Sequence, residues 1–169
     1  MSNNSEKIQG LVKKLKSPVF RFILIKTIAS AYFSELIRSV LTEKITNRKT
    51  ILLSVNKKNY RQLFDCIYKN SGNIIIFEDF DELINNKDLL IGFNQRRDKI
   101  AELNIAILAF VTKSNSIQKT MENLPDIWSF RSATIELEYL PKKISGRLTK
   151  IPPSFSLLDI NADMAREEI

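Results

Sequence analysis

Runs of apolar residues alternate with amphipathic segments along most of this chain. Runs rich in β-branched and aromatic residues, with little polar interruption, are typical of strands that are covered on both faces of a sheet. Between them, apolar positions recur at a spacing of three and four, which predicts helices with one buried side. The pattern predicts strands at 19–25, 50–55, 73–80, 105–111 and 133–139, and helices at 30–45, 59–69, 91–104 and 116–124.

Residues with specific backbone preferences mark several boundaries of these elements. Asn59 is a good N-cap for the second helix, and the sequence 70–72, which ends in glycine, predicts its end. Pro125 interrupts the last helix because proline cannot continue a helix. The apolar spacing within the helices predicts these inward-facing positions: Tyr60, Leu63, Phe64, Ile67, Tyr68, Ile91, Ile100, Ala101, Leu103, Ile117, Met121 and Leu124.

The order of strands and helices predicts the fold class. Five strands alternating with four helices indicate right-handed βαβ crossovers, which produce a parallel sheet between two helical layers. We therefore expect an α/β fold of three layers, doubly wound, with a mostly parallel five-stranded sheet. A chain of 169 residues fits one domain. We expect an N-terminal helical lead-in at 1–17, the α/β domain at 18–140 and a C-terminal tail at 141–169.

The composition excludes several kinds of chemistry. The chain has no histidine, which excludes histidine-based triads and zinc sites with histidine ligands. Its one cysteine, Cys66, cannot form an internal disulfide and stands among apolar residues, which is typical of a buried thiol in a reducing compartment. No apolar run approaches the roughly 20 residues that span a bilayer, and the N-terminus lacks the apolar core of a signal peptide. We expect a cytoplasmic protein.

The net charge of +7 is unevenly distributed. Residues 1–61 contain 13 Lys and Arg against 3 Asp and Glu, whereas residues 62–169 contain 13 against 16. A basic surface can bind phosphates or an acidic protein, although basic residues spread over helices and loops can also form an ordinary solvated face. The candidate partner-binding residues are Arg38, Arg48, Lys49, Lys57, Lys58 and Arg61.

Glycine is scarce, and its absence from one turn matters. The four glycines are at positions 10, 72, 92 and 146, so none follows the first predicted strand. Both the dinucleotide-binding G-x-G-x-x-G turn and the G-x-x-x-x-G-K-[ST] phosphate loop place glycines there, because backbone N–H groups must approach phosphate oxygens. The sequence predicts that no phosphate cradle forms after this strand.

Residues 18–138 resemble the nucleotide-binding core of STAND-type signalling NTPases, in particular inactivated members from bacterial defence and conflict systems. Lys26-Thr27 and Ser30 stand where the phosphate loop would be, and Glu78-Asp79 follow an apolar strand as the magnesium-binding acids do in active relatives. The block at 124–132, LPDIWSFRS, resembles a motif of this group and is the most specific part of the resemblance.

The resemblance implies a protein without catalytic residues, bound cofactor or metal. Its expected function is that of an adaptor or scaffold in a bacterial defence or signalling complex, with a protein partner encoded separately. An alternative is a residual nucleotide sensor or weak NTPase, and a second alternative is nucleic-acid binding through the basic half of the chain. The vestigial nucleotide-binding residues would be Lys26, Thr27, Glu78, Asp79 and Arg131.

The same residues also have purely structural interpretations. Glu78 and Asp79 can satisfy loop amides at the end of a strand, and Arg131 can pair with either of them. Trp128 and Phe130 are of the residue type that anchors a core. Adjacent residues on a strand point to opposite faces, so Glu78 and Asp79 are not expected to converge on one bond.

Overall fold

The computed structural model describes residues 3–123, 125–129, 131–139, 143–144 and 147–148. At its centre is a five-stranded sheet in the order β2-β3-β4-β1-β5, in which every neighbouring pair of strands is parallel. This sheet confirms the predicted fold class. The strands are β1 (Arg21–Lys26), β2 (Thr50–Leu53), β3 (Ile74–Phe77), β4 (Ala106–Val111) and β5 (Arg131–Glu136).

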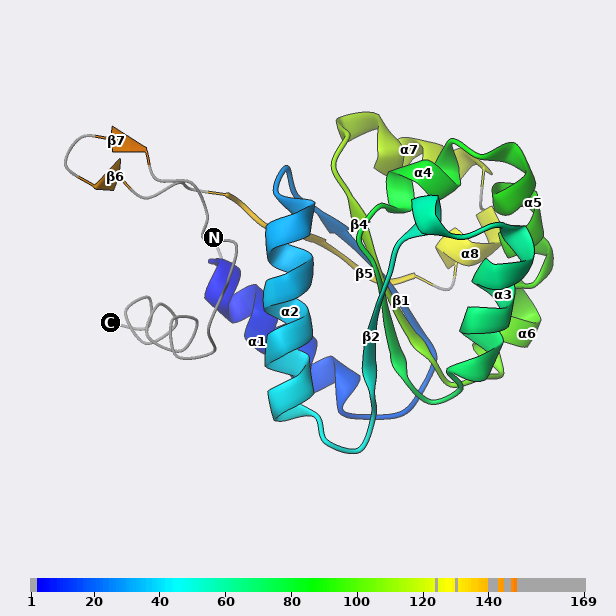
Figure 1. The fold of residues 1–169 in the computed structure, drawn as a ribbon, viewed down its shortest axis with the longest axis horizontal. Helices are drawn as coiled ribbons and strands as arrows, with labels where there is room; N and C mark the ends of the chain where they lie inside the picture. The colour runs from blue at the N-terminus through cyan, green and yellow to red at the C-terminus, as the bar shows by residue number, and fades with distance from the viewer. Residues whose placement is uncertain (1–2, 124, 130, 140–142, 145–146, 149–169) are drawn as a thin grey trace.

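Helices cover both faces of the sheet (Figure 1). One face carries α1 (Asn4–Leu15) and α2 (Ser30–Lys44). The other face carries α3 (Tyr60–Lys69), α5 (Lys87–Gln95) and α6 (Arg97–Ala101). The remaining elements are the 3₁₀ turn η1 (Val55–Lys57), α4 (Phe80–Ile84), α7 (Ser114–Asn123), α8 (Pro125–Ser129) and the two-residue strands β6 (Lys143–Ile144) and β7 (Arg147–Leu148), which pair antiparallel.

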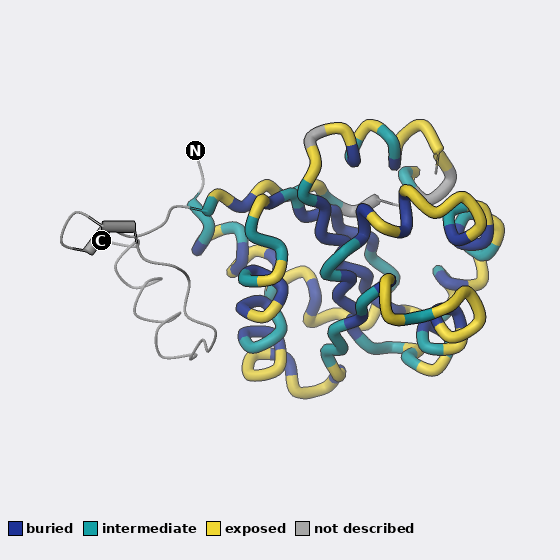
Figure 2. The backbone as a smooth tube through the Cα atoms, turned by 45° about the horizontal axis from the view of Figure 1, so that its top comes forward, coloured by how far each residue is buried: buried dark blue, intermediate teal, exposed yellow. Residues whose placement is uncertain are grey.

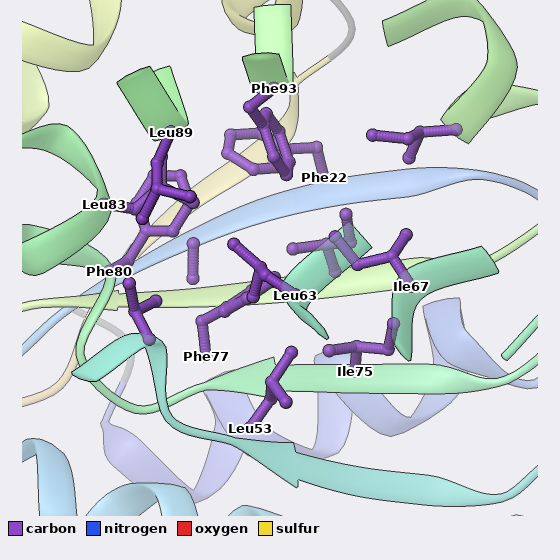
Figure 3. Packing of buried hydrophobic residues seen from close by; sticks show 14 of the residues in the cluster. Phe22, Leu53, Leu63, Ile67, Ile75, Phe77, Phe80, Leu83, Leu89 and Phe93 are labelled. Carbon is purple, nitrogen blue, oxygen red and sulfur yellow. The ribbon is translucent and has the colours of Figure 1, made fainter. Parts of the chain in front are cut away.

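Two hydrophobic clusters hold the layers together, one on each face of the sheet. Along β1, Phe22 and Leu24 contribute to the first cluster, which lies beneath α3 and α5. Ile23 and Ile25 contribute to the second cluster, which lies beneath α1 and α2. This alternation follows from the two-residue period of a strand. Figure 3 shows the first cluster, in which the Phe22, Phe80 and Phe93 rings pack together with centroids about 6 Å apart. Both faces of the central strands are therefore dry, as their continuous apolar sequence predicted (Figure 2).

The N-terminal helix is an integral part of this packing. Ile8, Leu11 and Leu15 of α1 are buried in the second cluster. Lys7 Nζ donates a hydrogen bond to the Glu136 carbonyl at 2.6 Å, so α1 is also tied to the end of β5. Residues that the sequence separates as a lead-in thus complete the core of the α/β domain.

Several element boundaries and burial predictions are corrected by the structure. The helix predicted over 91–104 is two helices that meet at Arg96. Leu89 and Phe93 face the core instead of Ile91, which is 45% exposed, because Leu89 and Phe93 lie one turn apart on α5 and Ile91 lies about half a turn from both. Met121 is also 45% exposed. The third predicted strand ends at Phe77, since Phe80 already begins α4.

Other predictions at the level of single residues are confirmed. Asn59 caps α3, and its side chain exchanges hydrogen bonds with the backbone and side chain of Gln62 in a capping box. Gly72 has φ +78°, a conformation that favours glycine, and ends the turn after α3. Trp128 packs at the edge of the first cluster and is partly buried. The predictions for Phe130 and for most of the tail at 141–169 lie outside the described residues.

Candidate functional site at the carboxyl edge of the sheet

Because all five strands are parallel, their carboxyl ends meet at one edge, which we call the carboxyl edge. In open α/β sheets this is the edge at which ligands bind. It carries the polar residues that follow each strand: Ser54 after β2, Glu78 and Asp79 after β3, and Thr112 after β4. Lys26 and Glu136 are the last residues of β1 and β5. Whether each group can bind a ligand depends on the bonds that it already makes within the protein.

The turn between β1 and α2 spans only residues 27–29 and contains no glycine. Thr27 is 3% exposed, and its Oγ1 accepts a hydrogen bond from the Ala29 N–H at 3.2 Å. The Thr27 N–H in turn donates to the Val111 carbonyl at 3.0 Å. Two of the amides that a phosphate cradle would use are thus bonded within the protein.

The one lysine at this turn has a carboxylate neighbour. Lys26 Nζ lies 4.0 Å from Glu136 Oε1, with the two side chains 29% and 65% exposed. Lys26 and Glu136 are directly paired residues of β1 and β5, so the sheet register itself places them together. The lysine at this turn therefore forms a weak, partly exposed pair with a protein carboxylate.

Asp79 uses both carboxylate oxygens within the protein. Oδ1 accepts from the Val55 N–H at 2.8 Å, and Oδ2 accepts from Ser54 Oγ at 2.9 Å and from the Asn56 N–H at 3.2 Å. These donors belong to η1 and the end of β2. Asp79 thereby fixes the turn after β2 against the end of β3, and a metal ion at this carboxylate would have to replace those bonds. The structure gives Glu78 no comparable side-chain partner among the described residues.

A second carboxylate, Asp81, links three segments of the same edge. It is 7% exposed and lies in α4. Its Oδ2 accepts from both the N–H and the Oγ1 of Thr112, each at 2.8 Å, and its Oδ1 accepts from Ser116 Oγ. Asp81 is not among the candidate residues that the sequence indicated. The signal available was the pair of hydroxyl residues just after β4, but only the fold brings them to Asp81.

The structure separates Arg131 from the other vestigial nucleotide-binding residues. Its backbone begins β5 and pairs with Phe22, near the opposite end of the sheet from Lys26. At the rise of a strand, four residues along β1 correspond to about 13 Å. The expectation that Arg131 shares a site with Glu78 and Asp79 is therefore corrected, because parallel pairing places its backbone at the amino ends of the strands. The side chain of Arg131 lies outside what the structure describes.

The six candidate partner-binding residues do not form a common surface. Arg38 is on α2 and binds Glu35 at 2.8 Å, whereas Arg61 is on α3, across the sheet, 3.9 Å from Asp65. Lys49 and Lys57 are exposed, and Lys58 is half-buried. Arg48 is corrected: it is 5% exposed and binds five backbone carbonyls, so it is unavailable to a partner.

A groove of about 500 Å³ lies beside the candidate site, between η1 and the junction of α4 and α5. Its lining includes Asn56, Lys58, Glu82, Asn86 and Lys87. These side chains are polar, carry both signs of charge and lie away from the β1–α2 turn. The described residues contain no group of three or more Cys, Asp or Glu placed to hold a metal ion.

Comparison with solved structures identifies the fold. The ORC2 protein of Aeropyrum pernix, in a structure of its ADPNP and ADP complexes, matches with a TM-score of 0.58 at 10% identity, over 79% of this chain and 47% of that one. The A. pernix ORC1 protein in complex with DNA matches with a TM-score of 0.53 at 12% identity, over 99% and 50% of the two chains. The fold is therefore P-loop NTPase-like.

A third match to this P-loop NTPase-like fold is PCH-2 of C. elegans, with a TM-score of 0.50 at 11% identity over 79% of this chain and 41% of that one. This chain therefore spans half or less of the length of each of these three proteins. No protein-family description and no curated protein matches the sequence. At these identities the likeness concerns the fold. Across the described residues, no helix is long and apolar enough to cross a membrane.

Proposed function

We propose that this protein is a non-catalytic interaction module derived from a P-loop NTPase. The observation that carries the proposal is the closed β1–α2 turn, which has three residues and no glycine. Phosphoryl transfer needs a phosphate cradle, a lysine and metal-binding acids acting together. Here Thr27 occupies the Ala29 amide, Lys26 faces Glu136, and both oxygens of Asp79 accept hydrogen bonds from the protein.

The resemblance to inactivated STAND-type proteins gives the proposal its biological setting. We expect an adaptor or scaffold in a bacterial defence or signalling complex, with the effector or sensor on another polypeptide. The turn offers a contact for such a partner, since Ile28 at its tip is 77% exposed. An apolar side chain on a rigid turn can anchor a protein interface.

Nucleotide binding tests the non-catalytic part of the proposal. A ligand at about 100 times its Kd stabilises a protein by about 2.7 kcal/mol, which thermal unfolding detects readily. We expect no change in the unfolding temperature with ATP, ADP or GTP in the presence of Mg²⁺. A shift that disappears in Lys26→Ala would overturn the proposal and support the alternative, a residual nucleotide sensor. A shift that persists in Lys26→Ala would place the nucleotide elsewhere and would also contradict a protein without a nucleotide ligand.

Affinity purification from the native cell tests the interaction part. The tagged protein should retain a specific protein partner, identified by mass spectrometry. Ile28→Asp should weaken this retention, whereas Ile91→Asp is a matched control, because Ile91 is also exposed but lies on α5, away from the turn. Equal retention by the wild type and Ile28→Asp would contradict docking at the turn, and recovery of the protein alone would contradict the adaptor function.

A further inference from the structure

The opposite edge of the sheet, where the strands begin, carries a cluster of basic residues. The last turn of α1 and the residue after it provide Lys13, Lys14 and Lys16, and the last turn of α2 provides Lys44. Lys49 stands immediately before β2, and Arg21 begins β1. We call these six residues the basic edge. In Figure 1 the ends of α1 and α2 lie along the lower side of the domain.

Side chain-to-backbone hydrogen bonds connect the chain segments that carry most of these residues. Arg48 Nη1 donates to the carbonyls of Leu15 and Ser17, which flank Lys16, at 2.9 and 3.1 Å. Arg21 Nε donates to the Lys14 carbonyl at 3.1 Å. Arg48 and Lys49 are adjacent in the chain, so the end of α1 is tied to the segment that leads into β2, and Arg21 ties it to the start of β1.

The positive charge of the basic edge is not neutralised within the described part of the chain. All five lysines are exposed, and none of them forms an ion pair with a described carboxylate. Glu43, the carboxylate nearest to Lys44 in sequence, is not paired with it either. Arg48 is a further cation, buried behind Lys49, and burial is the main cause that lowers its pKa, with the charge of Arg21 as the smaller cause.

The residue types at the basic edge favour a polyphosphate over a protein. Protein interfaces have an apolar centre rich in aromatic residues and depleted of lysine. Val19, at 43% exposure, is the only exposed large apolar residue that the described structure has close to the basic edge, and the charged residues are mostly lysines. Lysine ammonium groups without a recognition pocket suit the evenly charged phosphodiester backbone, which they contact without reading its bases.

We propose that the basic edge binds the backbone of a nucleic acid without sequence preference. This inference goes beyond the adaptor function and uses the opposite side of the domain, so the carboxyl edge stays available to a protein partner. It also replaces the six dispersed basic residues expected from the sequence with a different and continuous set. Only Lys49 belongs to both.

Fluorescence anisotropy of the full chain with labelled nucleic acids tests the proposal. The probes are a 20-nucleotide single strand and the corresponding duplex, each in two unrelated sequences. With about four phosphate contacts, the affinity for the duplex should fall roughly 100-fold between 50 and 200 mM salt. The quadruple variant Lys13→Gln, Lys14→Gln, Lys16→Gln, Lys49→Gln should bind at least about tenfold more weakly at 50 mM salt. All four substituted residues are exposed, and circular dichroism of the variant should match the wild type.

The matched control removes four positive charges from other surfaces by Lys57→Gln, Lys87→Gln, Lys113→Gln and Lys119→Gln. This variant should retain its affinity within about threefold, because its lysines lie toward the carboxyl edge, far from the proposed phosphate path. Equal losses in both quadruple variants would overturn the proposal in favour of general attraction by net charge. Absence of binding at 50 mM salt would overturn it outright, and binding to poly-glutamate but not to DNA or RNA would favour an acidic protein instead.

Discussion

The two edges of the sheet are stabilised by groups of opposite charge. At the carboxyl edge, the carboxylates of Asp79 and Asp81 accept hydrogen bonds from N–H and hydroxyl donors. At the amino edge, the guanidinium of Arg48 donates to the carbonyls of Leu15, Ser17, Gly72, Asn73 and Asn104. The partners of Arg48 are the last carbonyl of α1 and carbonyls of the loops that lead into the strands. The donors to Asp79 and Asp81 lie in η1, in the residues that follow β2 and β4, and in α7.

The two edges also differ in how far their polar groups are already bonded within the protein. In an active P-loop protein the donors of the carboxyl edge serve a nucleotide. Here protein carboxylates and Thr27 accept hydrogen bonds from several of those donors. The five lysines of the basic edge, in contrast, form no ion pair with a described carboxylate. A surface that keeps like charges together without neutralising them is the more informative place to look for an anionic ligand.

Removing Arg48 should have the largest effect on stability. Arg48→Ala leaves several buried carbonyls without donors and should lower the free energy of unfolding by roughly 3 kcal/mol or more. Arg48→Lys can replace only part of the planar donor set and should be intermediate. Urea denaturation followed by circular dichroism measures both. A loss below 1 kcal/mol for Arg48→Ala would contradict the stabilisation of the amino edge by this cation.

The two carboxylates of the opposite edge should differ from each other. Asp81→Ala removes the acceptor for two hydroxyls and one N–H at a buried position and should cost about 2–3 kcal/mol. Asp79→Ala should cost about 1–2 kcal/mol, because Asp79 is only half-buried and water can reach the released amides. Thermal unfolding of the two variants gives the order, and a larger loss for Asp79→Ala would show that burial does not set the difference.

The ion pair at the end of β1 should contribute least. Lys26 and Glu136 are 4.0 Å apart and partly exposed, so Glu136→Gln should change the free energy of unfolding by less than about 0.5 kcal/mol. The effect should shrink further at 0.5 M salt because screening weakens such pairs. Unfolding curves at two salt concentrations check this. A loss above 1 kcal/mol would mean that the pair is a structural feature comparable to Asp79.

The sequence predicts the strands and the parallel sheet because each central strand is apolar on both faces, a pattern typical of strands covered by helices on both sides. It failed over 91–104, where apolar residues fit more than one helical register. The spacing predicts a buried Ile91, but Leu89 and Phe93 fill the core, since they share the inner side of α5, which ends at Gln95. The capping box at Asn59 was predictable because a cap uses only neighbours in the chain.

For the candidate site, the sequence shows which residue type is missing from the turn after β1, but not how the site residues are arranged. The lack of glycine after β1 predicts that no phosphate cradle forms there. Which side chains share an edge depends on strand direction and register. These place Lys26 beside Glu136 and the backbone of Arg131 at the other end of the sheet. Asp81 and Ser116 are likewise far apart in the chain and meet only in the fold.

Local periodicity and residue type are enough to predict the alternation of strands and helices, the apolar core and the turn without glycine. The burial of Arg48 among carbonyls, next to an exposed Lys49, follows only from the packing of separate elements. Exposure and charge clustering depend on how separate elements pack, and single-chain patterns contain no distance between residues that lie far apart in sequence.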